Sequence, residues 1–295
     1  MGVATWYKGN IHIHTAGEGD TRPDRLVRWY EQHGYDFLVI TDHGRITLLD
    51  RGPDERCFQK PLLIPGEEVS AKTLGEEPVP VHLNAIGVSN LVEPIDAEGV
   101  SETLQTNIDA ILASGGIACI NHPNQGWAFD QEAICQVSGA NLLEVYNAWR
   151  GANVYGGVGK PSNEQIWDGV LSEGRLIYGV ATDDYPDPGF GWVVVRAYEL
   201  TADAIVNALA LGDFYASTGI VLAELELSQE SIRLVVEQDL DVLYATRFTG
   251  PEGLLLAERV GLEAEFRPRG DEGFVRATVR SSSGAKAWLQ PVLLP

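Results

Sequence analysis

The strongest constraint on the fold of this 295-residue chain is the alternation of strand-like and helix-like segments between residues 9 and 216. A strand, a helix and a further strand form a parallel β-α-β unit, so repeats of this pattern predict a parallel sheet. The number of repeats favours closure into a barrel. The runs that predict about seven strands, with Trp192–Val195 as an eighth, are Asn10–His14, Phe37–Ile40, Leu62–Ile64, His82–Ile86, Ile117–Ile120, Leu142–Val145 and Leu176–Val180.

Helix boundaries are marked by proline and glycine. The clearest helix begins near Pro23, a residue favoured in the first turn, and ends at Gly34. Further helices are predicted over residues 101–114, 163–173 and 202–211, and a glycine follows each of them. After about Gly219 the pattern contains strands and turns only, which predicts a small antiparallel β domain. The sequence thus indicates an α/β chain with domains at 1–219 and 220–295.

The chain is strongly acidic, with 42 Asp and Glu against 21 Lys and Arg and a formal net charge of −21. Electrostatic binding to the phosphates of a nucleic acid polymer or to an anionic membrane is therefore not expected. A small phosphorylated partner remains compatible, because bound divalent cations supply local positive charge. The start of the chain does not resemble a secretion signal, no apolar run is long enough to cross a bilayer, and the 3 cysteines form no CxxC pattern. The cytoplasm is therefore the expected compartment.

The histidines are few and unevenly placed. The chain has 6, and those at or just after predicted strand ends are His12, His14, His43, His82 and His122. Because side chains alternate along a strand, His12 and His14 are expected on the same face. A single buried histidine is about as often a hydrogen-bonded core residue as a ligand. That explanation is much weaker for the whole set.

Carboxylates occupy equivalent positions: Glu67 and Glu68 follow one strand, Glu144 lies in another, and Asp183 and Asp184 follow a third. Residues at the carboxyl ends of barrel strands meet at one mouth, even when they are distant in sequence. Imidazole and carboxylate together suit zinc, manganese and iron. We therefore expect a divalent metal site at that mouth.

Five motifs together resemble the PHP (polymerase and histidinol phosphatase) superfamily, over roughly residues 8–218. They are His12-Ile13-His14-Thr15, residues 34–43 ending in Thr41-Asp42-His43, Gly66-Glu67-Glu68-Val69-Ser70, Asn121-His122-Pro123-Asn124, and residues 179–184 ending in Thr182-Asp183-Asp184. Each motif is weak alone, but the ordered set is specific, since each supplies a different ligand. The resemblance implies a distorted β/α barrel with a three-metal site.

The resemblance also implies a ligand set. His12 and His14 would bind the first metal with Glu68 and Asp184, and Glu68 would bridge to a second metal held by His82 and His122. Glu68 is preferred over Glu67 because the family pattern is glycine, any residue, glutamate. Asp184 is preferred over Asp183 by similar reasoning.

The third metal is where the sequence departs from the family. His43 is present, and the early acid is Glu18 or Asp20, with Glu18 preferred. The family's last histidine is replaced by Pro186, which has no coordinating side chain. The third site is therefore weakened, rebuilt with Asp187 or Tyr185, or absent. We expect two or three Mn, Zn or Fe ions per chain.

The predicted activity is that of a metal-dependent phosphoesterase, in which a metal-bound hydroxide attacks a small phosphorylated metabolite or nucleotide. Glu68, His43 and Asp184 are the predicted catalytic residues, and Arg45 and Arg150 are either substrate contacts or solvated surface bases. Two alternatives stay open: a metal-binding protein without turnover, and a hydrolase of amides or lactones. The C-terminal β domain is expected to be structural, and the sequence leaves the oligomeric state open.

Overall fold

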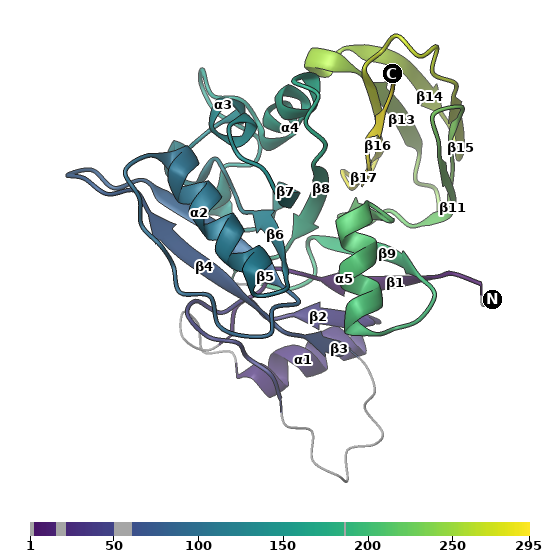
Figure 1. Cartoon of the computed structure of the whole chain (residues 1–295). Coiled ribbons are helices and arrows are strands. Elements are labelled where there is room, and N and C mark those ends of the chain that lie inside the picture. Colours follow the sequence, from purple (N-terminus) through teal and green to yellow (C-terminus); the bar gives the residue numbers. More distant parts are fainter. Residues whose placement is uncertain (1–2, 16–21, 50–60, 186) are drawn as a thin grey trace.

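The computed structural model describes residues 3–15, 22–49, 61–185 and 187–295, a mixed α/β structure with much sheet and few helices (Figure 1). Its helices are α1 (Pro23–Gln32), α2 (Val100–Ala113), α3 (Gln131–Cys135), α4 (Asn163–Ser172) and α5 (Ala202–Leu211), with 3-10 turns η1 (Gln125–Trp127), η2 (Arg150–Ala152) and η3 (Pro251–Gly253). The four predicted helices are confirmed. Gly34 follows α1 with φ of +72°, a left-handed conformation that favours glycine. Helix α3 was not predicted, because five residues are too short to show a periodic pattern.

The larger sheet has the order β14-β13-β16-β17-β10-β9-β1-β2-β3, with β18 beside β16. Its strands are β1 (Thr5–Asn10), β2 (Phe37–Val39), β3 (Leu62–Ile64), β9 (Trp192–Ala197), β10 (Phe214–Ser217), β13 (Tyr244–Thr249), β14 (Leu255–Val260), β16 (Phe274–Ser281), β17 (Lys286–Leu289) and β18 (Val292–Leu293). Only β1, β2 and β3 are parallel to one another in this sheet. Strand β9 corresponds to the predicted eighth strand, but it is not parallel to its neighbours. It pairs antiparallel with β1 on one side and with β10 on the other, and β10 connects it to the C-terminal strands.

The second sheet has the order β4-β5-β6-β7-β8, and its strands are β4 (Gly66–Lys72), β5 (Pro80–Ile86), β6 (Ile117–Ile120), β7 (Ala140–Asn147) and β8 (Tyr178–Thr182). Strands β6, β7 and β8 are parallel, as expected. Strand β4 was not predicted, and Glu67 and Glu68 lie in it rather than only following β3. The expectation of parallel pairing is wrong for β5, which pairs antiparallel with both β4 and β6. The short loop 73–79 returns the chain directly beside β4, and such a connection has no room for the crossover that a parallel pair requires.

The expected barrel is not closed by continuous strand pairing, since its strands fall into these two sheets. Isolated backbone bridges join the two sheets beyond the ends of β1, β2 and β8. Glu68 N donates to Thr41 O (3.1 Å), Asp184 N donates to His12 O (2.8 Å), and His14 N donates to Asp184 O (3.3 Å). Strand β1 also ends at Asn10, short of the predicted His14. The two sheets therefore meet through the segments that carry the predicted ligands.

Helices α2 and α4 cover the outer face of the second sheet (Figure 1). Helix α2 buries Leu104, Ile108 and Ile111, whose spacing of four and three residues places them on one face. Helix α4 buries Trp167, whose indole N–H donates to Ile177 O (2.9 Å) just before β8. These side chains fix the second sheet from outside. None of the helices in the described ranges is long and apolar enough to cross a membrane.

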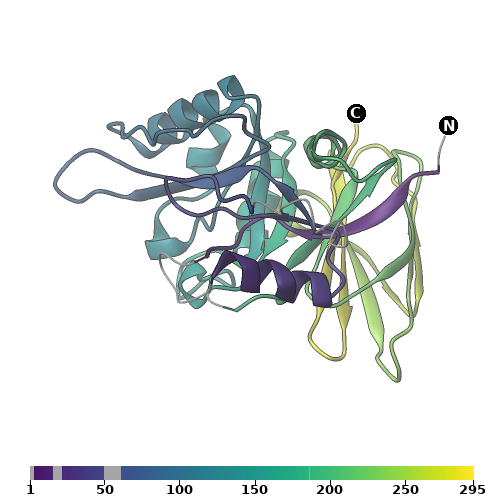
Figure 2. The ribbon, with the colours of Figure 1, turned by 90° about the horizontal axis from the view of Figure 1, so that it is seen from below.

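The C-terminal strands stand together at one side of the molecule (Figure 2). A third sheet, of β11 (Leu222–Leu227), β12 (Ile232–Val236) and β15 (Glu263–Phe266), pairs antiparallel as expected. Its buried Leu234 belongs to one apolar core with Phe248 of β13 and Val279 of β16. The larger sheet continues across residue 219 through the pairing of β10 with β17. The domain division at 219/220 stays a prediction.

Candidate metal centre

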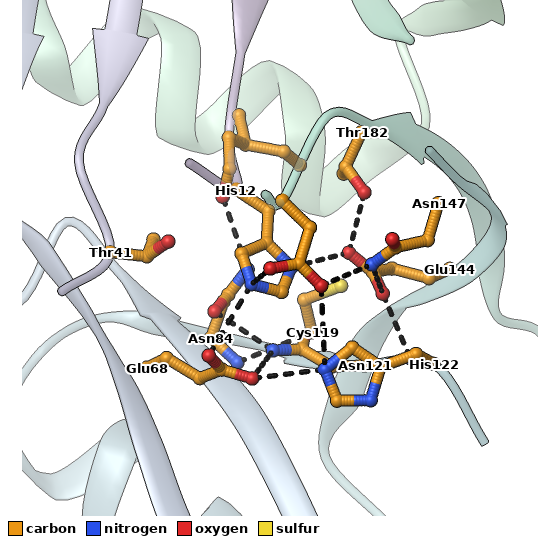
Figure 3. A network of polar contacts seen from close by, with 12 residues as sticks. His12, Thr41, Glu68, Asn84, Cys119, Asn121, His122, Glu144, Asn147 and Thr182 are labelled. Atoms are coloured by element: carbon orange, nitrogen blue, oxygen red, sulfur yellow. Dashed lines mark hydrogen bonds and ion pairs between the residues drawn. The ribbon is translucent and has the colours of Figure 1, made fainter. Parts of the chain in front are cut away.

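Five imidazoles surround the carboxylate of Glu68, and they come from different parts of the chain. His12 and His14 follow β1, His43 follows β2, His82 lies in β5, and His122 follows β6. One Glu68 oxygen, Oε2, lies 3.4 Å from His12 Nε2, 3.1 Å from His14 Nε2 and 3.4 Å from His43 Nδ1. The other oxygen, Oε1, lies 3.0 Å from both His82 Nδ1 and His122 Nε2. Figure 3 shows Glu68 facing His12 and His122.

Strand alternation sends Glu67 and Glu68 to opposite faces of β4. Glu67 points away from the histidines and accepts a hydrogen bond from Val92 N (2.6 Å). Gly66 fixes this register, because a Cβ there would lie 2.3 Å from Val39 Cγ1 and 2.8 Å from Ala85 O. The geometry therefore places Glu68, and not its neighbour, in the cluster.

The adjacent acids after β8 are also separated by their surroundings. Asp184 Oδ1 lies 3.3 Å from His14 Nε2 and 3.5 Å from His12 Nε2. Asp183 lies outside the cluster and accepts hydrogen bonds from Tyr30 OH (2.7 Å), the Asn10 side chain and the backbone N–H groups of residues 189–191. Asp184 has φ of +59°, a left-handed conformation that is strained for most side chains but less so for aspartate. Backbone strain of this kind often occurs at functional sites, so it supports a role for Asp184.

Glu144 lies behind His12 and is fully buried. Its Oε1 is 2.6 Å from His12 Nδ1 and accepts from Thr182 Oγ1 (2.7 Å), while Oε2 accepts from the backbone N of His122 (2.8 Å). Figure 3 shows these contacts converging on one carboxylate. A carboxylate on one imidazole nitrogen fixes the tautomer and turns the other nitrogen outward. Glu144 therefore orients His12 Nε2 toward Glu68 and Asp184.

Two asparagine side chains complete this supporting layer. Asn121 donates to Glu68 Oε1 (3.0 Å), and Asn147 donates to both Glu144 Oε2 (2.9 Å) and Asp184 Oδ2 (2.9 Å). Sequence reasoning noted Glu144 only as a possible ligand and did not identify Asn147. The available signal was the segment Glu144-Val145-Tyr146-Asn147, which places polar side chains at the end of an otherwise apolar strand.

The electrostatics of the cluster are those of acids and imidazoles that stabilise each other's charge. Burial alone would lower the pKa of His14, but hydrogen bonds to Asp184 and Glu68 raise it to about 9. Burial alone would raise the pKa of Asp184, but the charge of His12 and the hydrogen bond to His14 lower it to about 2. Burial alone would also raise the pKa of Glu68, but the charge of His12 and hydrogen bonds to His12, His122 and His14 together hold it well below its usual value. The carboxylates thus require positive charge among the imidazoles, which a divalent cation would also supply.

The donor set fits divalent metals in both chemistry and spacing. Three groups have all their ligand atoms within 4.8 Å of one another: His12, Glu68 and His122; His12, His14 and Asp184; and His14, His43 and Glu68. Metal bonds of about 2.0–2.2 Å to nitrogen and oxygen put neighbouring ligand atoms roughly 3–3.5 Å apart. The contacts of 3.0–3.5 Å around Glu68 and Asp184 match this spacing.

His43 is the most open of the five histidines, with a side chain 30% exposed against 18% for His82 and 5% or less for the others. Its ring stacks on His14 with centroids 4.7 Å apart, and Ser70 Oγ lies 2.5 Å from its Nδ1. Glu18, Asp20 and Pro186, the other residues predicted for or against a third metal, lie outside the described residues. The third site therefore stays a prediction.

The two predicted substrate arginines differ in their surroundings. Arg45 is half exposed and forms an ion pair with Asp42, with Nη2 and Oδ2 2.9 Å apart. Its Nη2 also donates to Thr15 Oγ1 (3.1 Å), next to His14 in the chain. Arg150 is exposed and begins the turn η2. Next to it, the Trp149 ring lies 6.2 Å from that of His122, in an edge-on arrangement.

Comparisons with known proteins reveal a likeness of fold. No protein-family model and no curated protein matches the chain. A solved two-domain protein from Bacteroides vulgatus, described as containing a predicted PHP-like metal-dependent phosphoesterase, aligns with 97% of this chain and 87% of its own, with a TM-score of 0.52 and 16% identity. A proposed metal-dependent phosphoesterase from Bifidobacterium adolescentis aligns with 60% of this chain and 87% of its own, with a TM-score of 0.37 and 18% identity. The first likeness covers both parts of the chain and agrees with the resemblance of the sequence motifs.

Proposed function

We propose that this protein is a metal-dependent phosphoesterase that hydrolyses a small phosphorylated metabolite or a nucleotide. The observation that carries the proposal is the position of Glu68, whose two oxygens lie 3.0–3.4 Å from five imidazole nitrogens. A carboxylate placed in this way is suited to bridge two cations. The fold that the chain shares with the B. vulgatus protein supports the same assignment.

In this proposal the ligands divide into two groups that share Glu68. His12, His14 and Asp184 lie on one side of it, and His82 and His122 lie on the Oε1 side. Divalent cations bound there would supply the Lewis acidity that polarises a phosphoryl oxygen and activates water at neutral pH. The chain itself holds the His12 imidazole in place through Glu144 and buries the rings of His12, His14 and His122.

His43 and Arg45 belong to the entrance of the proposed active site. His43 combines partial exposure with a contact to Glu68, so a substrate reaching the cations would pass beside its ring. The Arg45 guanidinium is half exposed and held in a fixed orientation by Asp42 and Thr15, and an oriented guanidinium suits a substrate phosphate. We propose that His43 contacts the reacting phosphate and that Arg45 binds a second anionic group or the leaving group.

Metal content and esterase activity test the proposal together. The purified protein is analysed for metals, stripped with a chelator, reloaded with Mn²⁺ or Zn²⁺, and assayed for release of phosphate from phosphomonoesters and phosphodiesters. We expect two or three metals per chain and activity that is lost on stripping and regained on reloading. His82→Ala should lower both metal content and activity, whereas His33→Ala, an exposed histidine stacked on Trp29, is the matched control.

The outcomes separate the competing functions. Bound metal without release of phosphate from any ester would favour a binding protein without turnover. Metal-dependent cleavage of amides or lactones, without cleavage of phosphate esters, would favour an amide or lactone hydrolase. Absence of bound metal after reloading would contradict the metal centre itself.

A further inference from the structure

A second site of interest lies on the opposite side of β7 from the histidines. A cavity of about 650 Å³ is bounded by α4, by Tyr146 of β7 and by one face of β13, β16 and β17. The volume is that of a small-molecule site, which typically measures ~300–1,000 Å³. None of the proposed metal ligands lines it, so its chemistry is considered separately.

The wall formed by the C-terminal strands is basic. Alternating residues of β13, β16 and β17 face the cavity, and the bases among them are Arg247, Arg276, Arg280 and Lys286. The intervening residues of β16, Val275, Ala277 and Val279, are buried in the core on the other side of the sheet. Four of the 21 bases of a chain with a net charge of −21 therefore line one cavity. One of the four, Arg247, is paired with Glu258, with Nε and Oε2 2.6 Å apart.

Two of these bases are placed unfavourably with respect to each other. Arg280 and Lys286 are directly paired residues on antiparallel strands, an arrangement in which like charges destabilise the sheet. Glu164 of α4 relieves part of this repulsion, since its carboxylate lies 2.5 Å from Lys286 Nζ. Within the described part of the chain, Arg280 makes no ion pair closer than 4.0 Å, although it is close enough to help lower the pKa of Glu164.

Arg276 does not add to this repulsion, because its positive charge is balanced by an ion pair with Asp168. It is buried and donates to both carboxylate oxygens of Asp168, at 2.6 and 2.8 Å. Arg276 and Lys286 are thus paired with Asp168 and Glu164, and the third acid of the lining, Glu252, forms no ion pair with Arg280 within 4.0 Å in the described part of the chain, so the positive charge of Arg280 has no ion-pair partner. An anion placed between Arg280 and Lys286 would balance it.

The same end of the cavity offers aromatic surface and an unused donor. Trp288 lines the cavity, its ring stacks on Tyr146 at 5.8 Å, and its buried indole N–H has no hydrogen-bond acceptor. The Lys286 ammonium lies 5.6 Å from the Trp288 ring centroid and 5.8 Å from that of Tyr155. Tyr155 is largely exposed, so its ring is available to a ligand.

We propose that this cavity binds a small organic anion, with its phosphate or carboxylate group between Arg280 and Lys286 and its apolar part against Tyr155 and Tyr146. The cavity shares β7 with the metal centre, because a β-bulge between Glu144 and Tyr146 interrupts the alternation, so that Glu144 faces the histidines and Tyr146 faces the cavity. The proposed ligand therefore contacts the strand that orients His12. The proposal does not depend on the chemistry at the metal centre.

Binding of simple aromatic anions to the intact protein tests this site. The probes are phenylphosphonate and benzoate, which separate phosphoryl from carboxylate recognition, and benzamide, which is neutral. Affinity is measured by titration calorimetry for the wild type, Arg280→Gln and Arg233→Gln. Arg233 is the matched control, because it is also an exposed strand arginine but lies on β12 and pairs with Glu224.

We expect one anion to bind and Arg280→Gln to weaken it about tenfold or more, as for loss of one charge-assisted hydrogen bond. Arg233→Gln should bind it as the wild type does, and benzamide should bind poorly. Lys286→Gln provides a second variant with the same expected loss. Equal affinity of the wild type and both cavity variants would overturn the proposal and would place any bound phosphonate elsewhere, including at the metal centre. Failure of both anions to bind at concentrations on the order of 1 mM would also overturn it.

Discussion

Replacing Glu144 with glutamine would remove a buried negative charge from behind His12 while keeping the length and shape of the side chain. The carboxylate accepts at both oxygens: Oε1 meets His12 Nδ1 and Thr182 Oγ1, and Oε2 meets His122 N and Asn147 Nδ2. A glutamine amide offers one oxygen and one NH₂ group, so it satisfies only one of these two pairs of donors.

Either orientation of the glutamine has a cost. If its NH₂ faces His122 N, a buried backbone donor loses its acceptor, which costs about 1–3 kcal/mol. If the NH₂ faces His12, Nδ1 must become an acceptor, and the proton moves to Nε2, the nitrogen that faces Glu68 and Asp184. A protonated Nε2 cannot bind a cation. Loss of such a supporting group typically lowers metal affinity ~10–100-fold, or about 1.4–2.8 kcal/mol.

The assay compares metal affinity with stability in the same variant. Zn²⁺ or Mn²⁺ affinity is measured by competition with a fluorescent chelator, and urea unfolding of the metal-free protein gives the free energy of unfolding. Glu67→Gln is the control, because Glu67 is equally buried and adjacent to Glu68 but points toward Val92 N. We expect Glu144→Gln to lower metal affinity and Glu67→Gln to leave it unchanged. Wild-type affinity in Glu144→Gln, or the same loss in both variants, would refute the orienting role.

Three further predictions follow from the geometry. Asp184→Asn should keep the fold, since asparagine also tolerates φ of +59°, but should lower metal affinity at least about tenfold in the same competition assay. Chelation should lower the unfolding midpoint in calorimetry, and added Mn²⁺ or Zn²⁺ should restore it, by ~2.7 kcal/mol at a hundredfold excess over Kd; a midpoint insensitive to metal would argue against the site. Glu164→Gln should reduce the free energy of unfolding at pH 7 by roughly 1–3 kcal/mol, because burial of Glu164 is outweighed by Lys286 and Arg276 and its pKa is lowered. That stabilisation is present above the usual glutamate pKa and is lost as the pH falls through the lowered value, so urea unfolding of variant and wild type should converge in acid; a constant difference would contradict this cause.

The gathering of His12, His14, His82 and His122 around Glu68 could be anticipated from the sequence, because histidine is rare here and occurs near predicted strand ends. Helix boundaries were equally readable, since Pro23 and Gly34 act through their own backbone preferences. Strand direction was not readable for β4, β5 and β6. A short apolar run has the same periodicity in either direction, and only its connection and its partner determine the pairing.

The supporting layer was hidden for a different reason. Glu144 and Asn147 are identified by what they touch, and those contacts join β7 to segments more than 100 residues earlier and about 40 residues later. A single acid in an apolar strand is equally compatible with a ligand or a supporting group. The same limit applied to the choice between Asp183 and Asp184 as the metal ligand. The sequence favoured Asp184 only by comparison with a family pattern, whereas the contacts of the two side chains in space distinguish them.

Strand β1 lies inside the larger sheet, between β9 and β2, and this has a consequence for how the protein is made. On a ribosome, residues 5–10 emerge some 180 residues before their neighbour β9, and β17, which completes the edge of β10, emerges later still. Pairings this distant in sequence form slowly and leave hydrogen-bonding edges open in the meantime. The segment bearing His12 and His14 therefore gains its full support only after β9 and β17 have both emerged, and a nascent chain that stalls between β10 and β17 would present β10 as an unpaired edge to its neighbours.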